Sequence, residues 1–126
     1  MANTITSLLI FVALVLICLV SSTFASDVHN IVQCPDAIAS NRSLYLTNIF
    51  EGGAFLQRKT RNIHFPEVGH NLYKITCLKI TDQDSRGKGG TARVVSGGYG
   101  SYDIEILLRS ALGGDINYRI ELWSDE

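Results

Sequence analysis

Apolar and polar residues alternate strictly near the carboxyl end of the chain. From Ile116 to Leu122 every even position is apolar and every odd position is polar. A period of two is expected of a β-strand with one buried and one solvent-facing side. The segment from Tyr102 to Leu108 alternates in a similar way, and the stretch 110–114 between the two ends in a glycine pair that suits the positive φ of a reversal. We therefore predict an antiparallel hairpin between these two segments.

Four further segments have the composition of strands. In chain order they are about 43–50, 55–65, 72–82 and 91–97. The second is rich in Arg and Lys, and such charges discourage edge-to-edge pairing, so we expect an edge or highly exposed strand there. Both prolines, Pro35 and Pro66, fall in predicted loops. Short strands at this regular spacing predict an all-β fold, a single antiparallel β-sandwich or small barrel.

The amino-terminal part of the chain is of a different kind. Thirteen consecutive residues from Leu8 to Val20 carry no polar side chain. A bilayer-spanning helix needs about 20 apolar residues, whereas the core of a signal peptide needs about 7 to 15. Small residues follow at Thr23 and Ala25, the two positions that signal peptidase reads. We predict a signal peptide over 1–25, cleaved after Ala25, with an uncleaved membrane anchor as the alternative that the length disfavours.

The predicted mature domain, residues 26–126, is nearly neutral. All charged side chains of the chain lie in it, and the formal net charge is −1. Such a balance creates no strong field toward DNA, RNA or an anionic membrane. We expect no direct nucleic-acid binding and no stable membrane anchor.

Two cysteines, Cys34 and Cys77, remain after removal of the signal segment. In an oxidising compartment two such thiols commonly pair, and we predict a disulfide between them, the alternative being two separate thiols with Cys77 buried in a strand. Asn41-Arg42-Ser43 is an acceptor tripeptide for N-glycosylation. The expected secretory route makes a glycan on Asn41 a prediction as well.

Several short motifs fail on their spacing. A calcium loop beginning at Asp82 would place Arg86 and Arg93 at its fifth and twelfth positions, where oxygen ligands are required. The stretch 87–90 lacks the spacing of a phosphate loop, and Val94 occupies the first glycine position of a nucleophile elbow around Ser96. We interpret all three as turns or strand ends.

No catalytic or metal-binding constellation emerges from the remaining polar residues. The histidines His29, His64 and His70 lack the spacing of metal ligands. Asp103 and Glu105 could form an acid–base pair, but charges on a solvated strand face more commonly serve solubility. We predict no enzyme activity, no metal and no cofactor.

Aromatic residues provide the remaining candidates for function. Tyr99 and Tyr102 lie beside glycines in the stretch 97–102, and Trp123 ends the last predicted strand. An exposed tyrosine between glycines can serve as a contact platform for a ligand or a partner protein. We predict Tyr99 and Tyr102 as a contact loop, the alternative being aromatic rings folded over the end of a sheet.

Residues from about 74 to 123 also contain an ordered set of short motifs. They are Ile75-Thr76, Leu78-Lys79-Ile80, Asp82-Gln83, Gly87, Gly89-Gly90, Ala92, Val95-Ser96-Gly97-Gly98, Gly100, Ile104, Ile106, Arg109-Ser110, Gly114, Ile116, Tyr118 and Ile120-Glu121-Leu122. This combination resembles the multiprotein bridging factor two family of insects. The resemblance implies either a transcriptional co-activator that bridges a nuclear receptor to the general transcription machinery, or one of the secreted salivary and haemolymph peptides of the same family. It supplies no catalytic residues.

The signal segment favours the secreted branch. Our first hypothesis is an extracellular binding or interaction protein of saliva, body fluid or venom, whose partner is an unidentified extracellular protein or ligand. The alternative is a non-DNA-binding co-activator whose partners are transcription factors. An enzyme acting through Asp103, Glu105 or Ser96 is a third hypothesis.

Overall fold

The computed structural model describes residues 2–20, 28–84 and 89–126. The apolar amino-terminal segment forms helix α1 (Ala2–Val20). Within the described ranges, no helix has the length and apolar character needed to cross a membrane. The predicted cleavage point after Ala25 lies outside the described residues, as do positions 85–88 of the rejected calcium and phosphate loops.

Within the described part of the chain, seven strands follow the helix. They are β1 (Ile31–Gln33), β2 (Arg42–Glu51), β3 (Thr60–Phe65), β4 (Cys77–Asp82), β5 (Thr91–Gly97), β6 (Ile104–Arg109) and β7 (Ile116–Ser124). All six predicted strands exist, but β3 and β4 are shorter than expected, because residues 55–59 and 72–76 belong to loops. The three-residue β1 was not predicted, since it is too short to show a period.

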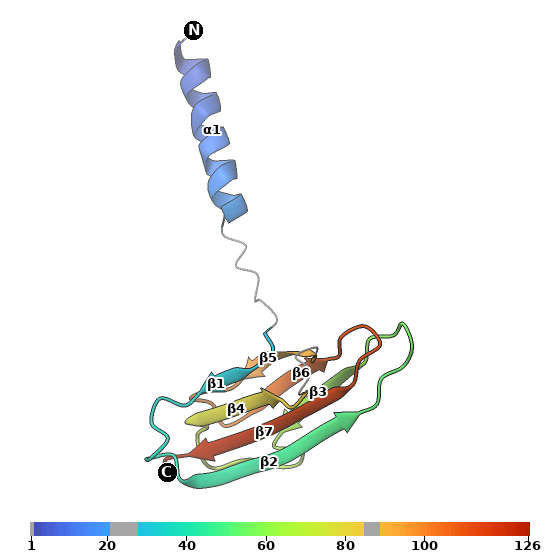
Figure 1. Cartoon of the computed structure of the whole chain (residues 1–126). Helices are drawn as coiled ribbons and strands as arrows, with labels where there is room; N and C mark the ends of the chain where they lie inside the picture. The colour runs from blue at the N-terminus through green and yellow to red at the C-terminus, as the bar shows by residue number, and fades with distance from the viewer. Residues whose placement is uncertain (1, 21–27, 85–88) are drawn as a thin grey trace.

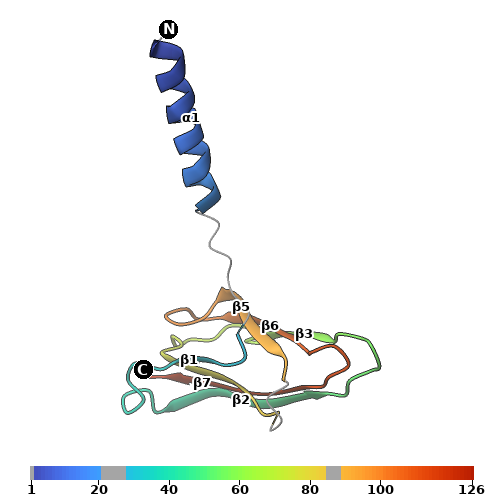
Figure 2. The ribbon, with the colours of Figure 1, turned by 45° about the horizontal axis from the view of Figure 1, so that its top comes forward.

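The strands form two antiparallel sheets. One contains four strands in the order β1-β4-β7-β2, and the other contains three in the order β3-β6-β5. Figure 1 shows the four-stranded layer in front of the three-stranded layer, and the turned view in Figure 2 separates the two. The fold is therefore the predicted antiparallel sandwich, with no closed barrel. Strand β3, which belongs to the basic segment 55–65, lies at a sheet edge, as expected.

The predicted hairpin between the two alternating segments is wrong. β6 pairs with β3 and β5, whereas β7 pairs with β2 and β4 in the opposite sheet. Directly after β6, the backbone of Ser110 donates to the carbonyl of Lys59, and the Lys59 amide donates to the Ser110 hydroxyl at 2.7 Å. These bonds extend the β3–β6 ladder, and the chain then crosses to the other layer. Two apolar strand faces bury more surface when they pack face to face than when they lie side by side in one sheet.

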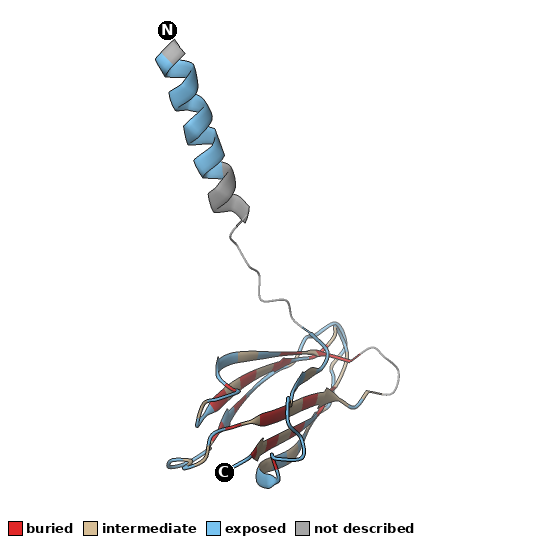
Figure 3. Ribbon diagram, turned by 90° about the vertical axis from the view of Figure 1, so that its left-hand side faces the viewer, coloured by how far each residue is buried: buried red, intermediate tan, exposed pale blue. Residues whose placement is uncertain are grey.

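The core lies between the two layers. The even positions of β7 from Ile116 to Leu122 are completely buried, and Ile104, Ile106 and Leu108 face them from β6. Figure 3 shows the resulting alternation of buried and more exposed residues along the strands. Tyr118 is the largest side chain in this core, and its hydroxyl donates to the carbonyl of His29 at 2.9 Å.

Burial raises the pKa of the Tyr118 hydroxyl, and the neighbouring charge of Asp82 raises it further. Ionisation inside the core would replace a satisfied hydroxyl with a poorly solvated anion. Tyr118 therefore stays neutral in the folded protein at physiological pH.

Candidate binding surface

Three loops and the carboxyl terminus meet at one end of the sandwich, which we call the tyrosine end. The loops are residues 34–41 after β1, 66–76 after β3 and 98–103 after β5. They gather there because β1, β3 and β5 all run toward that end, as does β7. Loops presented by a rigid scaffold are a common location for binding residues.

Backbone hydrogen bonds join the loop 66–76 to the loop 98–103. The amide of Ile75 donates to the carbonyl of Ser101 at 2.8 Å, and the amide of Gly100 donates to the carbonyl of Ile75 at 2.7 Å. The side-chain amide of Asn71 donates to the carbonyl of Tyr102 at 3.0 Å. The two loops therefore form one fixed surface.

A hollow of about 280 Å³ lies between these loops. Its lining residues are His64, Pro66, Gly69, His70, Asn71, Tyr102 and Asp103. Tyr102, one of the two predicted contact residues, thus belongs to this hollow. The imidazole ring of His64 is held by a local contact, because its Nδ1 lies 2.9 Å from the carbonyl oxygen of Pro66.

Tyr99 lies on the same loop but does not line this hollow. Its ring is half exposed, like that of Tyr102. Gly98 and Gly100 on either side both have positive φ, at 107° and 79°, which favours glycine at both positions. The turn around Tyr99 thus leaves about half of this residue in contact with solvent.

The tyrosine end also exposes aliphatic side chains that the sequence did not single out. Ile38 and Val68 are each 91% exposed, and Leu72 is 78% exposed. Exposed apolar side chains on loops at one end of a fold are candidates for a contact surface. No sequence signal distinguished these residues, because a lone apolar residue in a loop has no period.

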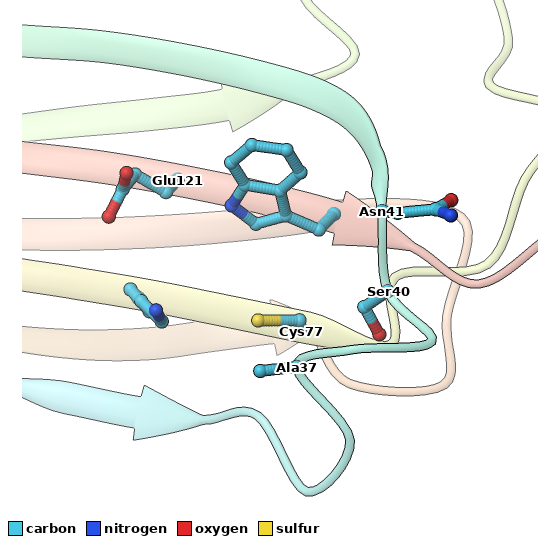
Figure 4. Close-up of a pocket in the computed structure, with 7 residues that line it drawn as sticks. Ala37, Ser40, Asn41, Cys77 and Glu121 are labelled. Carbon is cyan, nitrogen blue, oxygen red and sulfur yellow. The ribbon is translucent and has the colours of Figure 1, made fainter.

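A second hollow, of about 320 Å³, lies on the outer face of the four-stranded sheet. It is lined by Ala37, Ser40, Asn41, Cys77, Lys79, Glu121 and Trp123. Figure 4 shows Cys77 and Ala37 close together on one side and Glu121 on the strand across from them. The hydroxyls of Ser40 and Thr76 are 2.8 Å apart and connect the loop 34–41 to the chain before β4.

A disulfide joins Cys34 to Cys77 beside this hollow, with 4.1 Å between their Cα atoms. Cys77 is buried, and its register partner on β7 is Trp123. The link attaches the end of β1 to β4 and also holds the start of the loop 34–41. The predicted glycan acceptor Asn41 is exposed just before β2, and in Figure 4 its amide points away from Cys77.

Charges around this hollow are matched locally. A guanidinium nitrogen of Arg119 lies 3.4 Å from a carboxylate oxygen of Glu121, and Lys79 is the register partner of Glu121 on β4. Ion pairs at a partly exposed surface such as this one contribute little to stability. Their effect is to leave the wall of the hollow polar but nearly neutral.

Tyr45 on β2 connects the sheet to the loop 66–76. Its hydroxyl donates to a carboxylate oxygen of Glu67 at 3.0 Å, and its ring lies 5.2 Å from that of Phe65. Partial burial raises the pKa of Tyr45, and the Glu67 carboxylate adds to this effect. Tyr45 therefore stays neutral and holds the loop 66–76 by donating a hydrogen bond to Glu67.

The structure places Ser96 and His64 on either side of Glu105 in the three-stranded sheet. The hydroxyl of Ser96 donates to a carboxylate oxygen of Glu105 at 3.4 Å, while Asp103 lines the hollow near Tyr102. His64 is the register partner of Glu105, but its Nδ1 faces the carbonyl of Pro66. Among the described residues, no group of three or more His, Cys, Asp or Glu side chains is arranged to hold a metal ion.

The end opposite the tyrosine end carries a different exposed set. Phe55 and Leu56 were expected inside a strand, but they lie in the loop between β2 and β3, and Phe55 is 87% exposed. Leu56 has a positive φ of 53°, an unfavourable conformation for a residue with a Cβ. The prediction failed because a local apolar pair resembles a strand start when the partner strand is unknown.

The fold and these surfaces define a small disulfide-linked antiparallel β-sandwich that presents loops at both ends. A family model described as "Transcription activator MBF2" matches residues 36–124, and the chain belongs to this family. The match confirms the resemblance of the carboxy-terminal motifs and extends it to the earlier strands. A relative named "Probable salivary secreted peptide", from Bombus ignitus, is 29% identical over 99 residues, which are 76% of this chain and 69% of the relative. No solved structure matches the chain.

Proposed function

We propose that this chain is a secreted protein of insect saliva or body fluid that binds a protein or ligand through the tyrosine end. The observation that carries the proposal is the set of exposed apolar and aromatic side chains there, on loops fixed to one another by hydrogen bonds. Their exposure costs solvation free energy that a bound partner would recover. Binding of this kind requires neither a metal or cofactor nor a chemical step.

Three further observations support an extracellular site of action. The relative from Bombus ignitus is named as a salivary secreted peptide. The link between Cys34 and Cys77 suits an oxidising compartment. The apolar segment from Leu8 to Val20 has the length of a signal-peptide core.

Secretion is testable with the full chain expressed in insect cells. Mass spectrometry of the conditioned medium should find a chain that begins at Ser26, lacks two hydrogens relative to two free thiols, and carries a glycan removed by Asn41→Gln. Recovery only inside the cell, with Met1 retained and both thiols free, would contradict the proposal.

Binding is tested by comparing two variants of the secreted protein. Tyr99→Ala with Tyr102→Ala should reduce the capture of a partner from saliva or haemolymph, whereas Leu112→Ala, an exposed residue at the opposite end, should not. Equal capture by both variants would show that the tyrosine end is not the binding surface.

A co-activator is the second candidate function, favoured by the description of the matching family model. In this case the partners are transcription factors, and DNA is not contacted directly. A reporter assay with protein lacking residues 1–25 tests this function. Activation that requires the folded sandwich would support it, and an unchanged reporter would count against it.

A further inference from the structure

The strand β2 forms an open edge of the four-stranded sheet. It pairs with β7 on one side, and within the described residues no strand pairs with its other side. Figure 1 shows β2 as the outermost strand of the front layer. At ten residues it is also the longest strand of the fold. A long edge strand presents unpaired N–H and C=O groups that can bind another strand.

The features that usually protect an edge are missing from the middle of β2. Its charged residues, Arg42 and Glu51, are the first and the last of the strand, and it contains neither Lys nor Pro. Two apolar side chains, Leu46 and Phe50, project from its outer face and are 54% and 69% exposed. The edge strand β3 in the other sheet is different, because it carries Arg61 and is only six residues long.

The geometry of β2 limits how a second strand could pair with it. The pairing with β7 shifts between Ser43 and Tyr45, and the segment from Tyr45 to Glu51 is regular. The centre of this regular segment is Asn48. In an antiparallel pair, opposed side chains lie on the same face, so an outward residue must oppose another outward residue.

A second copy of β2 meets these requirements when Asn48 opposes Asn48 of the second copy. Leu46 then opposes Phe50 of the second copy, and Phe50 opposes Leu46 of the second copy. The residue on the two-fold axis is uncharged, and its amide can both donate and accept a hydrogen bond. The strand is therefore complementary to itself, as a two-fold interface requires.

We propose that two copies of this chain associate by antiparallel pairing of their β2 strands about a two-fold axis at Asn48, which joins their four-stranded sheets into one continuous sheet. The pairing satisfies the open backbone groups and covers Leu46 and Phe50 on the outer face. The proposal is argued from the edge of β2 alone, so it does not depend on the proposed function.

The first test changes the charge on the axis. Asn48→Lys places two ammonium groups opposite each other, and we expect the Kd of the dimer to rise at least about tenfold. Asn117→Lys is the matched control, because Asn117 lies on the same outer face but on the central strand β7. Sedimentation equilibrium of the secreted protein over a range of concentrations measures both, and circular dichroism verifies that each variant is folded.

The second test determines the register. Opposed Cα atoms in an antiparallel pair are about 4.5–5.5 Å apart, within the range that a disulfide bridges. Asn48→Cys should therefore give a covalent dimer that a reducing agent separates, whereas Asn117→Cys should remain monomeric under the same oxidation. Peptide mapping checks that Cys34 and Cys77 stay joined.

Three results would overturn the proposal. They are a wild-type protein that stays monomeric at its highest soluble concentration, a dimer that Asn48→Lys does not weaken, and a cross-link that forms faster through Thr47→Cys than through Asn48→Cys. If the wild-type protein stays monomeric, a strand of another protein becomes the candidate for pairing with β2.

Discussion

Reduction of the Cys34–Cys77 disulfide should destabilise the domain strongly and in a defined place. The link closes a loop with a sequence separation of 43 residues. In the chain-entropy model, opening a loop of this length costs about 4 kcal/mol of unfolding free energy, which corresponds to a fall in Tm of about 16 °C or more for a domain of this size. Both sulfur atoms remain after reduction, so no cavity adds to the effect.

The local consequence follows from the small number of contacts that hold β1. This strand pairs with β4 through only three residues. The residues just before it are held by the bridge between Val28 and Ala92 and by a few hydrogen bonds of His29 and Asn30. We therefore expect reduction to raise hydrogen exchange in β1 before the core strand β6 is affected.

Urea unfolding followed by the fluorescence of Trp123, the only tryptophan, measures the global effect. Cys34→Ser is the control, because its stability should match that of the reduced protein and should not respond to a reducing agent. A loss of less than about 1 kcal/mol, or equal exchange in β1 and β6, would refute the reasoning.

Three further predictions concern packing and pH. Gly53→Ala should lower the free energy of unfolding by about 1–3 kcal/mol, because the added Cβ would lie 2.6 Å from two backbone oxygens of the loop before β7. The control Gly52→Ala adds a Cβ that contacts nothing, so in urea unfolding its free energy should stay within about 0.5 kcal/mol of the wild type. Leu108→Ala should lower the free energy of unfolding by about 2–5 kcal/mol, because it removes a buried side chain from the core. Leu112→Ala, in an exposed loop, should leave thermal unfolding nearly unchanged. Burial raises the pKa of Tyr118, so the unfolded chain releases this proton first; stability is unaffected below about pH 10 and falls above it. Tyr118→Phe should weaken that alkaline decline in a pH series of urea unfolding, at a cost near neutral pH of about 1 kcal/mol for the lost hydrogen bond.

Local pattern alone determined a large part of this protein. The alternation from Ile116 to Leu122 correctly identified a strand and its buried face, because the period of a strand is a property of consecutive residues. The charges of the segment 55–65 placed β3 at an edge for a similar local reason. The motifs from about 74 to 123 were sufficient for the family.

Only the tertiary structure decided which strands pair and which surfaces stay open. β6 and β7 are adjacent in sequence, yet they lie in opposite sheets, because their apolar faces bury each other across the core. The open edge of β2 and the exposure of Ile38 and Val68 likewise depend on what does not pack against them. A local sequence pattern carries the periodicity of one segment, whereas partners and exposure are set by contacts between segments far apart in the chain.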